Sequence, residues 1–287
     1  MELKTDPPVV LRDAATIVML RDTPQGLEVF LIKRHGLSDV LGGAYVFPGG
    51  KLDASDAHVD AVAHLDQDPA TLHAALAEPE LVAGKATGLY VAALREAFEE
   101  SGVLLTQDPA AARAALADQR KLPFNQLLHA HGLRLQTSAM LPWARWITPV
   151  VPWFVQKRFD ARFFVAAVPP DQEARHDDHE ATESVWLAPR RALEQYWSGQ
   201  IELAPPQILS LAHLTRFATV RQVQDAARAT RPPVILPQAF EEDGTRVLYF
   251  PGGARHPLRE RALPGITELR FRNQRFEPSD GFDSLFS

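Results

Sequence analysis

Three glutamates lie close together in "LREAFEESGV", residues 94–103. If this segment is a helix, Glu96, Glu99 and Glu100 fall at positions i, i+3 and i+4, so their carboxylates share one face. Like charges at this spacing destabilise a helix by ~0.2–0.5 kcal/mol per pair. A divalent cation would offset the repulsion, and Mg²⁺ or Mn²⁺ prefers such hard oxygen ligands. The spacing alone leaves a solvated acidic helix face as the alternative.

Arg95 precedes the first glutamate and lies four residues before Glu99, so it could form an ion pair that holds this carboxylate in place. A metal ion at the cluster would act as a Lewis acid, activate a water molecule and neutralise phosphate oxygens. The functional interpretation of the segment is therefore metal-assisted chemistry on a phosphate group.

The glutamates need a helix that ends near Gly102, and a tight bend at Pro48-Gly49-Gly50 precedes that helix in the chain. Two apolar runs flank the turn-rich "RDTPQG" and predict a β-hairpin. The alternation of strands and helices predicts an α/β or α+β fold. The expected elements are strands at 15–20, 28–32, 144–150 and 159–168, helices near 55–65, 69–78 and 88–101, two short helices split at Pro123 within 108–132, a strand leading into a helix in "ESVWLAPRRALEQY", and helical structure over 205–229.

The sequence changes character at Arg231, where "RPPVILPQAFEEDGTRVLYFPGG" is Pro-rich and strand-like, with a hairpin turn at "EEDGT". We therefore expect a main domain over residues 10–230 and a strand-rich C-terminal extension over 231–287. The extension could complete an edge of the sheet or bind a second subunit in a homodimer, and the sequence leaves both open.

Composition narrows the function classes. The 287 residues carry a net charge of −6, which gives no general affinity for nucleic acid or anionic membranes. The chain has no cysteine, which rules out disulfides, thiolate metal sites and cysteine nucleophiles. Neither an apolar signal core nor an apolar run of bilayer length is present. We expect a cytoplasmic protein without a nucleic-acid or membrane partner.

"REAFEESGV" resembles the signature of the Nudix hydrolases: Arg, Glu, an apolar residue, any residue, Glu, Glu, any residue, Gly, an apolar residue. "FPGG", residues 47–50, matches the usual entry to the Nudix loop. The resemblance implies a Nudix fold, a mixed β-sheet sandwiched between helices, and hydrolysis of a diphosphate linked to another moiety. It also implies the site residues: Glu96, Glu99 and Glu100 as ligands of Mg²⁺ or Mn²⁺, Arg95 as the residue that orients them, and the backbone carbonyl of Gly49 as a metal contact.

The spacing inside this motif departs from the Nudix pattern. The Arg usually lies fourteen residues after the second Gly, which would be residue 64, whereas here it is Arg95, 31 positions later. We interpret residues 54–86 as a helical insertion before the catalytic helix, which would cover the active site or form a partner surface. The pattern's glutamate eight positions before the Arg is Thr87 here, and Asp53 is the remaining acid in the early loop.

A Nudix box interrupted in this way resembles the branch that includes the peroxisomal coenzyme A diphosphatases. "WARWITP", "KRFDARFFVAAVP" and "LAPPQILSL" continue that resemblance to about residue 225. It implies coenzyme A or acyl-CoA as the nucleotide substrate, cleaved to 3′,5′-ADP and 4′-phosphopantetheine. Alternative substrates are NADH, ADP-ribose, nucleotide sugars and dinucleoside polyphosphates. A non-catalytic Nudix module that senses a nucleotide is a second class of function.

The resemblance also implies an acidic residue from the loop "HDDHEATESVWLAP" as general base or further metal contact. Glu183 is favoured over Glu180 for this role. His176 and His179 in the same loop lack a ligand spacing, so exposed loop positions are expected for both.

Basic residues at strand ends are candidate substrate contacts, because a guanidinium fork matches phosphate oxygens. Lys33 and Arg34 end an apolar strand, and Arg158 could meet a 3′-phosphate together with Arg145 and Arg162. The nearby aromatic residues are expected to build the core in preference to stacking on adenine: Trp143, Trp146, Phe163 and Phe164.

Overall fold

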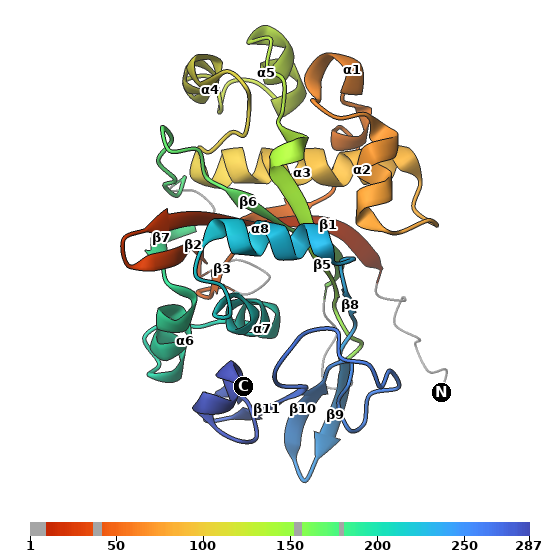
Figure 1. Ribbon diagram of the computed structural model, residues 1–287, viewed down its shortest axis with the longest axis vertical. Coiled ribbons are helices and arrows are strands. Elements are labelled where there is room, and N and C mark those ends of the chain that lie inside the picture. The colour runs from red at the N-terminus through yellow and green to blue at the C-terminus, as the bar shows by residue number, and fades with distance from the viewer. Residues whose placement is uncertain (1–9, 37–41, 152–156, 178–180) are drawn as a thin grey trace, which may run out of the picture.

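The computed structural model in Figure 1 contains a central sheet with helices on both sides and a smaller C-terminal sheet. It describes residues 10–36, 42–151, 157–177 and 181–287. Within these residues the central sheet has eight strands in the order β3-β2-β1-β6-β5-β8, with β4 paired to β1 and β7 paired to β2. The strands are β1 (Leu11–Thr23), β2 (Gly26–Arg34), β3 (Tyr45–Val46), β4 (Gly49–Lys51), β5 (Met140–Ile147), β6 (Arg158–Ala167), β7 (Ala181–Leu187) and β8 (Val234–Ile235).

The parallel pair β1 and β6 forms the middle of this sheet, with partners from Leu11–Arg158 to Leu20–Ala167. Successive side chains of a strand point to opposite faces. Ile17 therefore enters one buried cluster, and its neighbour Val18 enters another on the opposite face. Because both faces are buried, these strands read as continuous apolar runs.

Helices cover both faces, so the expected sandwich is confirmed. The helix that carries the glutamates, α3, packs on one face together with α2, α4 and α5, and α6, α7 and α8 pack on the other. The helices are α1 (Ala61–His64), α2 (Pro69–Leu76), α3 (Ala83–Ser101), α4 (Pro109–Leu116), α5 (Phe124–Ala130), α6 (Pro189–Trp197), α7 (Pro205–Leu214) and α8 (Val220–Ala229).

Helix α3 begins five residues before the expected 88–101, at Ala83, because its first turn follows the extended residue Val82. It ends at Gly102, whose φ of 72° is the left-handed conformation that stops a helix. Most of its 19 residues are buried against the sheet and the neighbouring helices. No helix within the described ranges is long and apolar enough to cross a membrane.

The insertion is less helical than expected. Residues 55–65 form a 3₁₀ turn at Asp56–His58 (η1) and the single helical turn α1, whereas the expected helix at 69–78 is found as α2. An aspartate caps the start of each helix in the insertion. The Asp60 carboxylate accepts hydrogen bonds from the backbone N–H groups of Val62 and Ala63 at α1, and the Asp68 carboxylate accepts one from the backbone N–H of Thr71 at α2. Each cap residue begins a separate short helix, so the helical structure of the insertion is divided into short segments.

Most other expected elements are present with shifted bounds. The strand expected at 144–150 is β5, which begins at Met140 after the 3₁₀ turn η2 (Thr137–Ala139). Pro123 separates α4 from α5 as expected. The helical stretch over 205–229 is two helices, because Thr219 adopts an extended conformation and caps α8.

The C-terminal residues form a four-stranded antiparallel sheet in the order β12-β11-β10-β9. The expected hairpin is confirmed, because Asp243 and Gly244 both have positive φ between β9 and β10. Leu248, Phe250 and Leu269 join the same buried cluster as α7 and α8. The new elements are β9 (Gln238–Glu242), β10 (Thr245–Tyr249), β11 (Glu268–Arg272), β12 (Arg275–Glu277) and the 3₁₀ turn η3 (Phe282–Phe286).

Candidate active site

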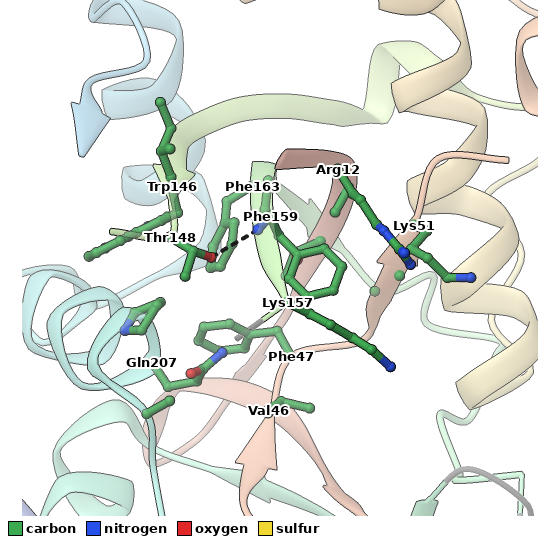
Figure 2. Close-up of a pocket in the computed structure, with 18 of the residues that line it drawn as sticks. Arg12, Val46, Phe47, Lys51, Trp146, Thr148, Lys157, Phe159, Phe163 and Gln207 are labelled. Carbon is green, nitrogen blue, oxygen red and sulfur yellow. Dashed lines mark hydrogen bonds between the residues drawn. The ribbon is translucent and has the colours of Figure 1, made fainter. Parts of the chain in front are cut away.

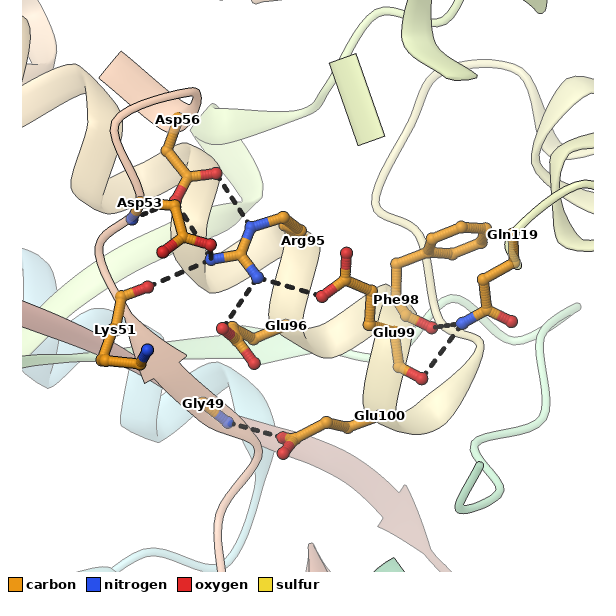
Figure 3. A network of polar contacts seen from close by, with 10 residues as sticks. All are labelled: Gly49, Lys51, Asp53, Asp56, Arg95, Glu96, Phe98, Glu99, Glu100 and Gln119. Atoms are coloured by element: carbon orange, nitrogen blue, oxygen red, sulfur yellow. Dashed lines mark hydrogen bonds and ion pairs between the residues drawn. The ribbon is translucent and has the colours of Figure 1, made fainter. Parts of the chain in front are cut away.

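The side chain of Arg95 is the centre of a polar network at α3 (Figure 3). Its Nη1 donates hydrogen bonds to Glu96 Oε1 at 2.8 Å and to Glu99 Oε2 at 3.0 Å. Its Nη2 donates to the backbone carbonyl of Lys51 at 3.1 Å, which ties α3 to β4. The ion pair between Arg95 and Glu99 that the sequence predicted is therefore present. The structure shows that Arg95 also contacts Glu96 and the backbone of β4.

Asp56 is the strongest partner of Arg95 and was missed by the sequence analysis. Its carboxylate accepts from Arg95 Nε at 2.9 Å and from Nη2 at 3.0 Å, in the bidentate geometry that suits a guanidinium. The Asp56 side chain is only 1% exposed. Burial lowers the pKa of Arg95, but hydrogen bonds and charges from Asp56, Glu96 and Glu99 outweigh it and raise the pKa above its ordinary value. The only sign of Asp56 in the sequence was an acidic residue inside the insertion. The residues around it gave no reason to separate it from the other acidic residues expected on the surface.

Two glycines let β4 approach α3 closely. The backbone N–H of Gly49 donates to Glu100 Oε2 at 2.8 Å, and Glu100 is 3% exposed. A Cβ on Gly50 would lie 2.2 Å from Glu96 Oε1, so only glycine leaves the present place of that carboxylate free. The tight bend expected at Pro48-Gly49-Gly50 is limited to Pro48, because Gly49 and Gly50 belong to strand β4. This strand meets the glutamate helix, although the chain between them is long.

The donor atoms around α3 suit a hard cation. Glu96, Glu99 and Glu100 would supply carboxylate oxygens and Gly49 a backbone carbonyl, which are the kinds of ligand that Mg²⁺ and Mn²⁺ prefer. Within the described ranges no three acidic or histidine side chains form a ready-made cage. Mg²⁺ commonly binds through one or two carboxylates and keeps several waters, so an open site of this kind fits it.

A cavity of about 1000 Å³ lies beside this network. Glu96 and Glu99 line it, together with Gly49, Arg95 and Asp53, whereas Glu100 is buried against Gly49. The insertion contributes little to the lining, because Asp53 is the last residue before α3 to reach the cavity in the described part of the chain. The insertion instead packs on α3 through η1 and α2.

Basic side chains line the same cavity. Arg34, one of the predicted phosphate contacts, is among them, and its buried Nε has no hydrogen-bond partner in the described structure. Arg12, Lys51 and Lys157 also line it and were missed by the sequence analysis. They come from three separate strands or strand ends, so no local pattern could group them.

Glu183 and Lys33 do not line this cavity in the described structure. Glu183 accepts a hydrogen bond from Tyr45 Oη at 2.6 Å and pairs with Lys33 Nζ at 3.0 Å. The hydrogen bonds from Tyr45 and Lys33 lower the pKa of Glu183. Burial, together with Glu183, raises the pKa of Tyr45 to about 12. Glu180 and His179 lie outside the described residues.

The other predicted basic contacts are held elsewhere. Arg158 Nε donates to the backbone carbonyl of Thr148 at 3.0 Å. Arg162 is 3% exposed at its side chain and pairs with Glu78 at 2.6 Å, and Arg145 pairs with Asp160 at 2.6 Å. The last two arginines thus belong to an ion network between β5, β6 and the end of the insertion.

The four aromatic residues are buried as expected. Phe164 packs on Tyr90 of α3 with a ring distance of 4.6 Å, and Trp143 stacks on His213 at 4.8 Å. Trp146 and Phe163 also present an edge to the cavity. The sequence analysis treated a place in the core and a contact with a ligand as alternatives. Trp146 and Phe163 belong to the core and also line the cavity.

Comparisons with known proteins identify relatives of this chain. Two curated relatives are acyl-coenzyme A diphosphatase NUDT19 of Xenopus laevis, 28% identical over 235 residues, and that of Homo sapiens, 29% identical over 235 residues. Each alignment covers 68% of this chain and 62% of the relative, so the chain spans less than two thirds of the length of these proteins.

A solved structure extends the likeness to the fold. A crystal structure of a NUDIX hydrolase from Alicyclobacillus acidocaldarius superposes with a TM-score of 0.61 and 26% identity, over 79% of this chain and 99% of that one. A family model described as the NUDT19 Nudix domain matches residues 9–214. The resemblance carried by the interrupted Nudix box is thereby confirmed: the chain belongs to the NUDT19 Nudix domain family of the Nudix hydrolases.

Proposed function

We propose that the chain is a Mg²⁺- or Mn²⁺-dependent diphosphatase that hydrolyses coenzyme A or acyl-CoA to 3′,5′-ADP and a 4′-phosphopantetheine product. One observation carries this proposal: acidic and basic side chains meet in one cavity of about 1000 Å³. Glu96 and Glu99 face it from α3, and Arg12, Lys51 and Lys157 line the same space. A substrate with several phosphates and a metal ion requires both kinds of charge.

The acidic residues would bind the metal ion, and the basic residues would bind the phosphates. Glu96, Glu99, Glu100 and the Gly49 carbonyl would hold the metal, which when bound polarises phosphoryl oxygens and neutralises their charge. Arg95 keeps Glu96 and Glu99 in fixed positions through its two short hydrogen bonds. Fixed ligands matter because a misplacement of about 1 Å can reduce a rate ~100-fold.

The basic side chains would bind the phosphates of the substrate. Arg34 is the best-placed of the predicted contacts. Its buried Nε has no hydrogen-bond partner in the described structure, and a phosphate oxygen could accept a hydrogen bond from it. A buried donor left without a partner costs about 1–3 kcal/mol, which a bound phosphate would recover. Lys33 and Arg158 are held by Glu183 and Thr148, so a contact with substrate would require those bonds to open.

Glu183 would have to leave both Lys33 and Tyr45 to act as a general base. Its role therefore remains a prediction, which the variant Glu183→Gln tests. If Glu183 is the base, kcat falls at least 100-fold and its acidic limb disappears from the pH profile. If Glu183 only anchors Tyr45, kcat changes little.

The proposal is tested by a product-resolved hydrolysis panel with Mg²⁺ and with Mn²⁺. The substrates are CoA, acetyl-CoA, NADH, ADP-ribose and a dinucleoside tetraphosphate, each incubated with the wild type and with Glu99→Gln. Glu194→Gln is the matched control, because it makes the same change at an exposed glutamate that does not line the cavity in the described structure.

We expect 3′,5′-ADP from CoA with the wild type and the control, and a loss of at least 100-fold with Glu99→Gln. Turnover of a different substrate would retain the site and reject the CoA assignment. No turnover of any substrate, with nucleotide binding that survives in Glu99→Gln, would favour a sensor.

A further inference from the structure

Two residues that line the cavity each carry a buried polar atom without a hydrogen-bond partner in the described structure: Trp146 Nε1 and Gln207 Oε1. Trp146 is 4% exposed and Gln207 is 5% exposed. The first atom is a donor and the second an acceptor. In the described structure, therefore, the wall of the cavity contains one unpaired N–H and one unpaired carbonyl, just beneath its surface.

These two residues lie on the side of the cavity opposite to Arg12 and Lys51, and Lys157 lies between the two sides. Figure 2 shows Trp146 and Gln207 on one side and Arg12 and Lys51 on the other. Apolar residues accompany them: Phe163 packs on Trp146, Phe47 packs on Phe163, and Ala204 and Pro205 precede Gln207 in the chain. Leu248 and Phe276 also line the cavity. Charge at one end and apolar surface at the other would suit a ligand with a phosphate head and an uncharged arm.

The unused atoms limit what that arm can be. Each buried group without a partner costs about 1–3 kcal/mol, so a purely aliphatic arm would leave both penalties in place. A secondary amide carries one carbonyl acceptor and one N–H donor. It could therefore satisfy Trp146 through its carbonyl and Gln207 through its N–H, and two successive amides could share the task.

We propose that Trp146 and Gln207 form a subsite that recognises an amide-bearing arm of the substrate. This inference rests on the proposed function, and it assigns the pantetheine arm of coenzyme A, which contains two amides, to the apolar end of the cavity. Leu248 and Phe276 lie beyond the family match at residues 9–214, so the C-terminal extension completes the wall of this subsite.

The position of Gln207 follows from its helix. Ala204 is the N-cap of α7, and Pro205 and Pro206 fill the first turn, where a missing N–H is tolerated. Gln207 then projects from the first turn of α7 into the cavity, while Ile208 and Leu211 of the same helix are fully buried. Its polar group is therefore held at the cavity wall by rigid structure on both sides.

The test compares binding of the two product fragments, because each carries one half of the substrate. Affinities for 4′-phosphopantetheine and for 3′,5′-ADP are measured by calorimetry with Mg²⁺ present, in the wild type, Gln207→Met and Trp146→Phe. Methionine keeps an unbranched side chain of similar length and removes the acceptor. Thermal unfolding establishes that each variant is folded.

His213→Phe is the matched control. His213 also lies on α7 and has a buried Nδ1 without a partner in the described structure, but it does not line the cavity and stacks on Trp143. If loss of any buried polar group on α7 weakened binding, this control would weaken it too.

We expect Gln207→Met and Trp146→Phe each to weaken 4′-phosphopantetheine about tenfold, equivalent to ~1.4 kcal/mol. Binding of 3′,5′-ADP should change less than twofold, and His213→Phe should resemble the wild type. Wild-type affinity for 4′-phosphopantetheine in both folded variants, or equal loss for both fragments, would overturn the subsite. If the wild type does not hydrolyse CoA yet binds 4′-phosphopantetheine through Gln207, the proposed function fails and the subsite stands.

Discussion

The carboxylate of Glu96 occupies the place where a side chain of residue 50 would begin. A Cβ on Gly50 would lie 2.2 Å from Glu96 Oε1 and 2.4 Å from its Cδ. The obstructing atoms are the end of a flexible side chain, and the backbone around Gly50 is not in the way. The contact therefore sets where Glu96 can point, while the fold itself does not depend on it.

Gly50→Ala is accordingly predicted to impair activity more than stability. The new methyl group pushes the Glu96 carboxylate aside, so we expect kcat/KM to fall about 100-fold while the free energy of unfolding changes by less than ~1 kcal/mol. Steady-state assays and urea unfolding measure the two quantities. Gly84→Ala on α3, where a Cβ meets nothing within 4 Å, is the control for both.

Gly49→Ala is predicted to behave in the opposite way. Its Cβ would lie 2.5 Å from the backbone oxygen of Ala15 and 2.7 Å from Cα of Thr16, at a φ of 156°. Backbone atoms of β1 cannot move aside cheaply, so the free energy of unfolding should drop by about 1–3 kcal/mol. A fully stable Gly49→Ala variant would contradict the close packing of β4 on β1.

Asp56 is predicted to be a positioning residue. Asp56→Asn keeps the shape but removes the charge that pairs with Arg95, and it should cost about 3 kcal/mol of stability because the pair is buried. We expect kcat to fall at least tenfold with little change in KM, since Arg95 then holds Glu96 and Glu99 less firmly. Asp225→Asn, at an exposed pair, should change neither quantity. An unchanged kcat in folded Asp56→Asn would leave Asp56 with a structural role alone.

Glu78 tests whether the insertion anchors the fold or serves the reaction. Its carboxylate pairs with Arg162 and Arg145, which tie the end of the insertion to β6 and β5. Glu78→Gln removes one carboxylate from this network, while Asp160 still pairs with both arginines and Asp13 with Arg162. A loss of about 1–3 kcal/mol in unfolding free energy is therefore expected. The kcat of the folded variant should remain within twofold of wild type, because Glu78 does not line the active-site cavity.

His213 is predicted to make the protein less stable in mild acid. Burial, with a smaller contribution from Arg216, lowers the pKa of His213 from 6.5 to about 4. The unfolded chain therefore takes up a proton as the pH falls below 6.5, and the folded protein does not until about pH 4. Stability is thus lost as the pH falls through this window, by about 2 kcal/mol between pH 7 and pH 5.

Urea unfolding of the wild type and His213→Phe at both pH values measures this effect. Phenylalanine can keep the stacking on Trp143 and does not titrate, so the loss on going to pH 5 should be about 2 kcal/mol smaller in the variant. Parallel pH profiles for the two proteins would show that His213 is charged when folded.

The sequence by itself identified the residues of the candidate site on α3. Glu96, Glu99 and Glu100 lie within five consecutive residues, with Arg95 beside them. Once this segment is helical, their carboxylates share one face whatever the rest of the fold is. The helix stop at Gly102 and the hairpin turn at Asp243-Gly244 are local for the same reason. The family and the mixed sheet between helices were inferred from the resemblance of "REAFEESGV" and "FPGG" to the Nudix signature.

Only the tertiary structure decided which other residues meet that helix. Asp56 reaches Arg95 from an insertion whose cap residues break it into short turns, and Arg12, Lys51 and Lys157 converge from separate strands. Glu183, expected near the site, pairs with Lys33 and Tyr45 because β7 lies in register beside β2. Trp146 and Gln207 line the same cavity as Leu248 and Phe276 of the C-terminal extension. Such contacts depend on strand register and packing between residues far apart in the chain, and neither leaves a periodic signal in the sequence.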